Sequence, residues 1–170
     1  MYKKGIQIVA IVGLLIAFMG CSSGSKLKSK EQVGNYVFEL LETINVKSLE
    51  ETVDLFATKS DIEQYLKEFS QEESSESKYY KVIDEETAEK PEYLYTAVNT
   101  IKRDAAKYGI EWDKVIYLDF IVPHFVDKKE YRGELFIKYD EKVYAIFVDF
   151  ITLKDKYYLT NLSGIQRVSR

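Results

Sequence analysis

The chain has 170 residues but only one cysteine, one histidine, two prolines and one tryptophan. One cysteine cannot form an internal disulfide, and so few histidine and cysteine ligands make a zinc site unexpected. The longest apolar run is shorter than the roughly 20 residues that a membrane-spanning helix requires. Basic residues are also in deficit, with 24 Lys and Arg against 28 Asp and Glu. Because phosphate contacts need a basic surface, we expect no nucleic-acid partner, and no motif indicates a metal or cofactor.

The N-terminal segment has the pattern of a secretory leader. Met1–Lys4 is short and basic, and Ile6–Met19 is almost entirely apolar. The stretch Phe18-Met19-Gly20-Cys21 resembles a bacterial lipobox. The resemblance implies that residues 1–20 are a lipoprotein signal peptide, and that Cys21 carries the lipid, palmitate among its acyl chains, and becomes the first mature residue. The alternative interpretation is an uncleaved N-terminal anchor with an incidental cysteine.

Residues 21–29 are predicted to form a flexible lipidated tether, because Ser22–Ser25 consists of serine and glycine. Lys26, Lys28 and Lys30, which follow this serine and glycine stretch, either contact anionic headgroups or belong to a solvated linker. The first twenty residues hold two lysines and no acid, so residues 21–170 carry 22 basic and 28 acidic side chains, a formal charge of −6. We expect a cell-envelope protein held on its membrane, on the periplasmic side or the outer face, by the N-terminal lipid.

From Ser29 onward the apolar residues recur at the spacing of one helix face. Three helices are predicted, each starting at a serine that is followed three residues later by an acid or amide: Ser29 with Gln32, Ser48 with Glu51, and Ser60 with Glu63. A polar loop is predicted for 70–77, and a short strand for Tyr79–Ile83. Pro91–Tyr108 is predicted to form the longest helix, and Gly109 to cap it.

After Trp112 the hydrophobic period changes from that of a helix to two. Four strands are predicted: Val115–Val126, Tyr131–Tyr139, Val143–Leu153 and Tyr157–Ile165. Short polar turns between the last three require antiparallel neighbours. Val143–Val148 is apolar on both faces, which predicts a central strand whose second face lies in a pocket or a dimer interface. The fold class is therefore α+β, with the helices on one face of a curved antiparallel sheet of about four strands.

This order of elements resembles the NTF2-like fold, a cone in which a curved sheet backed by helices encloses a cavity; the cystatin-like arrangement is its near neighbour. The resemblance covers about Lys30 to Val168, so we treat 30–170 as one domain. The resemblance is compatible with an envelope protein of unassigned activity and with a pocket enzyme, because proteins that share a fold can differ in function.

Two carboxylates are the candidate catalytic groups. Asp119 and Asp149 each interrupt an apolar strand, where burial without partners would cost several kcal/mol. In the resembling fold an acid that points into the cone sometimes serves as a general base. Strict alternation would place Asp119 with Tyr117 and Ile121, and Asp149 with Phe147 and Ile151. The alternative is that each Asp is exposed or ion-paired. The single histidine, His124, is expected at the rim or surface.

Two functional classes remain. The first is a non-catalytic, lipid-anchored envelope protein that binds a protein, peptide or small ligand through its sheet face or cavity, with an inhibitor or immunity protein as a subclass. The second is an NTF2-like pocket enzyme that uses Asp119 or Asp149 as an acid or base. We expect the first, with the membrane as one partner, an unidentified protein or small molecule as another, and a homodimer through the sheet as a further arrangement.

Overall fold

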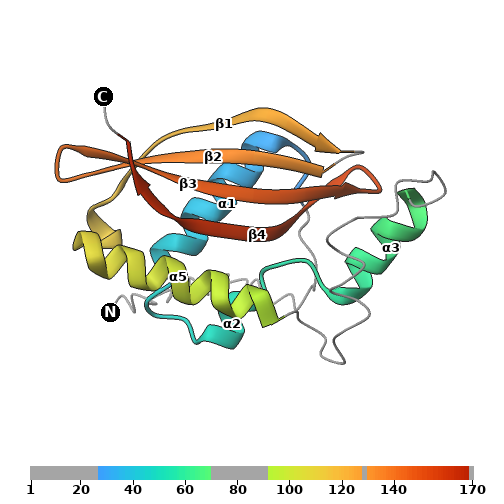
Figure 1. Ribbon diagram of the computed structural model, residues 1–170, viewed down its shortest axis with the longest axis horizontal. Coiled ribbons are helices and arrows are strands. Elements are labelled where there is room, and N and C mark those ends of the chain that lie inside the picture. Colours follow the sequence, from blue (N-terminus) through green and yellow to red (C-terminus); the bar gives the residue numbers. More distant parts are fainter. Residues whose placement is uncertain (1–26, 70–91, 128–129, 169–170) are drawn as a thin grey trace, which may run out of the picture.

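The computed structural model describes residues 27–69, 92–127 and 130–168 (Figure 1). In chain order the elements are α1 (Lys30–Thr43), α2 (Leu49–Val53), α3 (Lys59–Phe69), α5 (Glu92–Tyr108), the 3-10 helix η1 (Trp112–Lys114), β1 (Ile116–Asp127), β2 (Glu130–Tyr139), β3 (Lys142–Leu153) and β4 (Lys156–Arg167). The predicted α+β class is confirmed. The predicted signal peptide, Cys21, the loop 70–77 and the strand Tyr79–Ile83 lie outside the described residues.

Two of the three predicted helix starts are confirmed. The Ser29 side chain accepts a hydrogen bond from the Gln32 amide, and Ser48 forms a complete capping box with Glu51. The third prediction is wrong by two residues, because α3 begins after Thr58 rather than at Ser60. The Thr58 hydroxyl accepts a hydrogen bond from the Asp61 amide at 3.1 Å, while the Asp61 carboxylate accepts from the Thr58 amide at 2.8 Å. Thr58 and Asp61 therefore satisfy the first free amides of the helix.

The long helix α5 ends as predicted. Gly109 has a φ of 66°, a left-handed conformation that glycine adopts without steric cost. The Ile110 amide donates to the Ala105 carbonyl at 2.9 Å, and the Gly109 amide donates to the Ala106 carbonyl at 3.1 Å. This pair of hydrogen bonds is the Schellman motif, and Ile110, the residue after the glycine, is buried.

The four strands form one antiparallel sheet in the order β1-β2-β3-β4. The hairpin turns Asp140-Glu141 and Lys154-Asp155 each have two residues with positive φ, between 48° and 60°. Such turns match the twist of the strands that they join, although glycine or asparagine usually occupies them. The predicted central position of β3 is confirmed, since β2 and β4 flank it.

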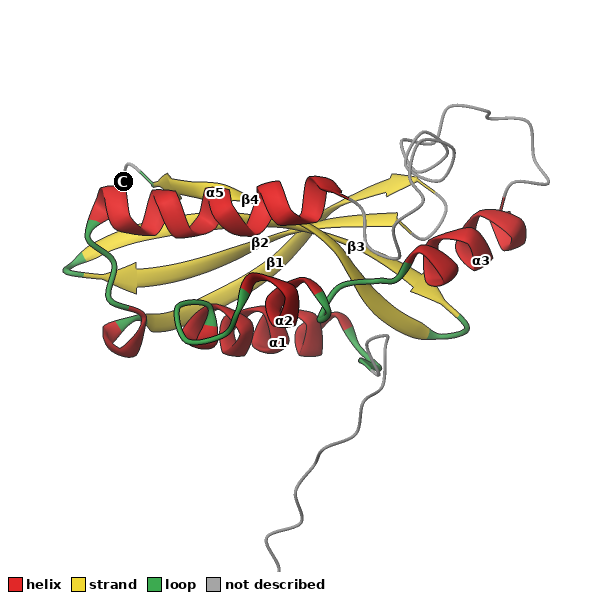
Figure 2. Cartoon of the chain, turned by 90° about the horizontal axis from the view of Figure 1, so that it is seen from below, coloured by secondary structure: helices red, strands yellow, loops and turns green. Residues whose placement is uncertain are grey.

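The core lies on the face of the sheet that carries Ile146, Val148 and Phe150 of β3. There α1 packs against β1, and α5 runs along β4 (Figure 2). One cluster of buried side chains joins these helices to the sheet, and its members that are essentially inaccessible include Val33, Val37, Leu41, Leu94, Val98, Ile101, Leu135, Ile137, Ile146, Val148, Phe150 and Leu159. Burial on this scale supplies most of the stability of a domain of this size.

The expectation that all the helices lie on one face is wrong for α3. Ile151 and Leu153 alternate with Phe150, so they point to the opposite face of β3. They pack there with Ile62 and Leu66 of α3 in a second buried cluster. The physical reason is that the end of β3 beyond Asp149 carries apolar side chains on both faces, and α3 covers the second face there.

Candidate functional site

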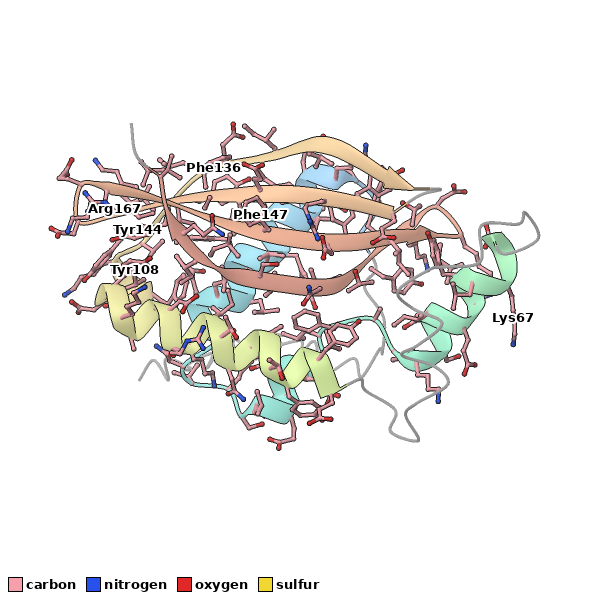
Figure 3. The ribbon with its side chains drawn as sticks, viewed as in Figure 1. Lys67, Tyr108, Phe136, Tyr144, Phe147 and Arg167 are labelled. Carbon is pink, nitrogen blue, oxygen red and sulfur yellow. The ribbon has the colours of Figure 1, made fainter. Side chains whose placement is uncertain are left out.

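The sheet face opposite the core, which we call the open face, carries apolar side chains on three neighbouring strands. Of the described helices, only α3 packs against it, at its Ile151 end. Phe136 of β2 and Phe147 of β3 are half-buried rings on this face (Figure 3). Three residues of β1 are exposed large hydrophobics: Ile116, Leu118 and Ile121, with 56%, 42% and 46% of their surface exposed. Charged residues border them: Asp119 lies between Leu118 and Ile121, and Lys138 and Glu134 are the register partners of Ile116 and Ile121. Exposed apolar side chains rimmed by polar residues are typical of interaction sites.

A β-bulge in β1 decides which of its residues reach the open face. Tyr117 pairs with Ile137, but Asp119 pairs with Phe136, so one extra residue stands between them. Tyr117 therefore points to the core face, where its ring contacts Phe38 of α1 at 5.5 Å between centroids. The prediction that Asp119 shares a face with Tyr117 is wrong for this reason, whereas its predicted companion Ile121 keeps the same register.

Asp149 lies on the open face with Phe147 and Ile151, as alternation predicts, but it is only 3% exposed. Both of its oxygens bind Arg132, which is directly opposite on β2, at 2.7 Å from Nε and 3.1 Å from Nη2. Asn161 of β4 donates to Oδ2 at 3.4 Å. This bidentate pair compensates the burial of the carboxylate. The Arg132 side chain remains 47% exposed.

Asp119 is exposed, and its Oδ1 accepts a hydrogen bond from the next backbone amide, that of Phe120, at 2.8 Å. Its register partner on β2 is Phe136, while that of Asp149 is Arg132. Phe136 and Arg132 are four positions apart on β2, which corresponds to about 13 Å along the strand. The two carboxylates opposite them therefore do not share one reacting centre. The expectation of an exposed or ion-paired Asp at each position is confirmed.

His124 occupies a register position opposite Arg132 on β1, and its side chain lies outside the described residues. Among the residues that the structure describes, no three His, Cys, Asp or Glu side chains gather as metal ligands would. In the same ranges, no helix has both the length and the apolar character needed to cross a membrane.

The two edges of the sheet differ. The β4 edge forms four hydrogen bonds with three other segments. The Leu27 carbonyl accepts from Tyr157 N at 3.0 Å, and the Leu159 carbonyl accepts from Ala57 N at 2.7 Å. Two residues of α5 make the others: the Thr160 carbonyl accepts from the Tyr93 hydroxyl at 3.1 Å, and the Asp104 carboxylate accepts from Ile165 N at 3.2 Å. No described segment other than β2 pairs with β1 through its backbone. An edge of that kind can accept an additional strand.

The ion pair on the open face was missed from the sequence, although a signal for it exists. The two-residue turn Asp140-Glu141 fixes the register of β2 and β3. Counting eight residues outward from each turn residue places Arg132 opposite Asp149, as observed. The covering of the β4 edge has no comparable signal, because it joins segments that are far apart in the sequence.

Compared with known proteins, the chain matches no family model, no curated sequence and no solved structure.

Proposed function

We propose that this protein is a lipid-anchored protein of the bacterial cell envelope that binds a partner protein through its open face and the β1 edge, without catalysis. The difference between the two sheet edges supports this proposal most directly. Hydrogen bonds with three described segments cover the β4 edge, whereas the β1 edge is bordered by Ile116, Leu118 and Ile121. An extended segment of a partner could form backbone hydrogen bonds with the β1 edge and apolar contacts with these three side chains.

The lipid anchor rests on the sequence Phe18-Met19-Gly20-Cys21. Its test is replacement of Cys21 by Ala and labelling with a radioactive fatty acid. We expect the label and the membrane association to be lost together. Persistence of both in the variant would show that another feature holds the chain on its membrane.

As part of the same proposal, we assign the domain to the NTF2-like or cystatin-like arrangements. The meander of four strands and the long helix α5 that precedes it support this assignment. A pocket enzyme is the weaker alternative, because Asp149 is held by Arg132 and Asp119 lies about 13 Å away along the sheet.

The binding surface is tested by photo-crosslinking in intact cells. A photoreactive amino acid is placed at Ile121 in one variant and at Val46 in the other, since Val46 is 82% exposed in the loop after α1. We expect one protein to be crosslinked from position 121 and not from position 46. A second copy of this chain as the product would identify a homodimer, and equal crosslinking from both positions would refute the proposed surface.

A further inference from the structure

The point at which the chain enters the domain lies against the turn between β3 and β4. Leu27 forms an antiparallel bridge with Tyr157, and its carbonyl accepts a hydrogen bond from the Tyr157 amide at 3.0 Å. In an antiparallel register the next residue of one strand lies opposite the preceding residue of the other. Lys28 is therefore opposite Lys156, and the Lys154-Asp155 turn is adjacent. In Figure 1 the start of α1 and this turn lie toward the same end of the sheet.

Four lysines gather here, and we call them the basic end: Lys28, Lys30, Lys154 and Lys156. Among the described residues, no carboxylate forms an ion pair with any of them. The acids nearest in the chain are Glu31, whose pKa is lowered by hydrogen bonds from its own backbone and from Ser29, and Asp155. Like charges that face each other across a bridge destabilise it unless an anion lies between or beside them. The basic end is therefore a surface suited to an external anion.

Two tyrosines of the core face lie beside Lys30, whereas alternation places the Lys156 side chain on the opposite face from Tyr157. The ammonium of Lys30 lies 4.4 Å from the ring centroid of Tyr131, and the rings of Tyr131 and Tyr157 are 6.1 Å apart. Both tyrosines are half-buried, and each packs against the buried ring of Phe150. Tyrosine and lysine side chains with an apolar body and a polar tip are typical of the membrane–water interface.

The tether limits how far this surface can be from a bilayer. Leu27 is six positions after Cys21 in the chain, and six fully extended steps span about 20 Å. An anchor at Cys21 would thus hold the basic end within a short distance of the lipid headgroups. The acidic character of the rest of the chain would disfavour other docked orientations on an anionic surface.

We propose that the basic end docks the domain on the headgroups of anionic lipids, in the orientation that leaves the β1 edge accessible. The proposal rests on the lipid anchor of the proposed function. β1 and β4 are opposite edges of the four-stranded sheet, about 14 Å apart, and Lys154 and Lys156 lie on the β4 side of one sheet end. Lys30 reaches Tyr131 of β2 at the same end. Docking through this end of the sheet leaves the open face and the length of the β1 edge accessible to a partner protein.

The test uses the lipidated protein purified from the membrane and reconstituted on vesicles. An environment-sensitive dye is attached through Asp155→Cys in one variant and Glu141→Cys in the other. These are the second residues of the two hairpin turns, with φ of 59° and 60°, at opposite ends of the sheet. On vesicles that contain phosphatidylglycerol we expect a blue shift of the dye at position 155 only, reversed by salt, and no shift on phosphatidylcholine alone.

Charge removal gives the second readout. Each lysine near an anionic surface contributes about a fivefold factor, so Lys154→Gln with Lys156→Gln should lower the docked-to-undocked ratio roughly twentyfold. The matched control, Lys138→Gln with Lys142→Gln at the other turn, makes the same change in net charge and should alter the ratio less than about twofold.

The two proposals fail in different ways. Mass spectrometry of the Cys21 peptide reports the lipid, so an unmodified peptide refutes the anchor. With the lipid present, equal emission from position 155 on both kinds of vesicle, or an equal response from position 141, refutes the docking. An equal loss in the two lysine variants would also refute it, since only net charge would then matter.

Discussion

At the scale of single residues, the Arg132–Asp149 pair is an asymmetric interaction. Asp149 is 3% exposed, whereas the Arg132 side chain is 47% exposed. Removing the arginine would deprive a buried carboxylate of the guanidinium that binds both of its oxygens, and such losses cost roughly 3–5 kcal/mol. Removing the carboxylate would leave a guanidinium that water can still reach. Truncation of Arg132 is therefore expected to cost more stability than truncation of Asp149.

We predict that Arg132→Ala lowers the free energy of unfolding by about 3 kcal/mol and Asp149→Ala by clearly less. Urea denaturation of both variants and of the double variant gives the coupling energy between the two residues. If the two single variants were equally stable, the carboxylate would not depend on the guanidinium, and the ion pair would not explain the burial of Asp149.

Burial also affects a tyrosine of the core. Burial, with a smaller contribution from the charge of Glu39, raises the pKa of Tyr36 to about 12. Its hydroxyl donates to the Leu55 carbonyl at 3.0 Å, and this interaction requires the protonated form. The unfolded chain loses the same proton near pH 10. The stabilising effect is therefore complete below about pH 10 and is lost as the pH rises from there to about 12.

We predict that stability falls by up to about 2–3 kcal/mol between pH 10 and 12 because of Tyr36, and that Tyr36→Phe removes this part of the decline. At neutral pH the same variant should be about 1 kcal/mol less stable, because the hydrogen bond to Leu55 is missing. Denaturation curves at several alkaline pH values measure both effects. Parallel pH profiles for the two proteins would contradict the assignment.

At the scale of elements, a close approach between α1 and the sheet depends on two glycines. A Cβ atom at Gly34 would lie 2.5 Å from Cβ and Cγ of Phe120, and a Cβ at Gly133 would also meet the Phe120 ring. The ring of Phe120 thus lies between α1 and β2, next to residues without side chains. Glycine inside a helix costs up to about 1 kcal/mol relative to alanine, so its place here reflects packing rather than propensity.

We predict that Gly34→Ala destabilises the protein by about 1–3 kcal/mol, although alanine favours the helix. Adding Phe120→Ala, which removes the clashing Cγ and Cδ1 atoms, should recover part of that loss, and Phe120→Ala alone measures the cost of the missing ring. Ala106→Gly, at an exposed position of α5, serves as the reference for helix propensity alone. Thermal unfolding measures the stability of each variant. A gain in stability for Gly34→Ala alone would show that α1 can move away from Phe120 and relieve the clash.

At the scale of the whole molecule, the two faces of the sheet differ in how far helices cover them. The core face is filled by α1, α5 and the buried side chains between them. The open face keeps exposed apolar residues on β1, and α3 covers only one end of it. Leu27 pairs with Tyr157 at the β4 edge, so this contact and the β1 edge, which no described segment other than β2 pairs with, are on opposite sides of the sheet.

Much of this arrangement follows from local signals in the sequence. Capping residues place the starts of α1 and α2, Gly109 ends α5, and alternation with short turns places four strands to within about two residues. These features depend on neighbours a few positions apart, so periodicity and turn chemistry are sufficient for them. The start of α3 was misplaced because Thr58 and Asp61 form an equivalent cap two residues earlier.

Other features depend on contacts between distant segments, and only the tertiary structure decided them. The bulge that separates Tyr117 from Asp119 arises from the pairing of β1 with β2, and it reverses the face on which Tyr117 lies. The position of α3 on the second face follows from where Ile151 and Leu153 remain uncovered. The sequence alone determined the class, the order of elements and the candidate lipid site at Cys21. Which carboxylate is paired and which edge is free required the folded chain, because both depend on residues brought together only by packing.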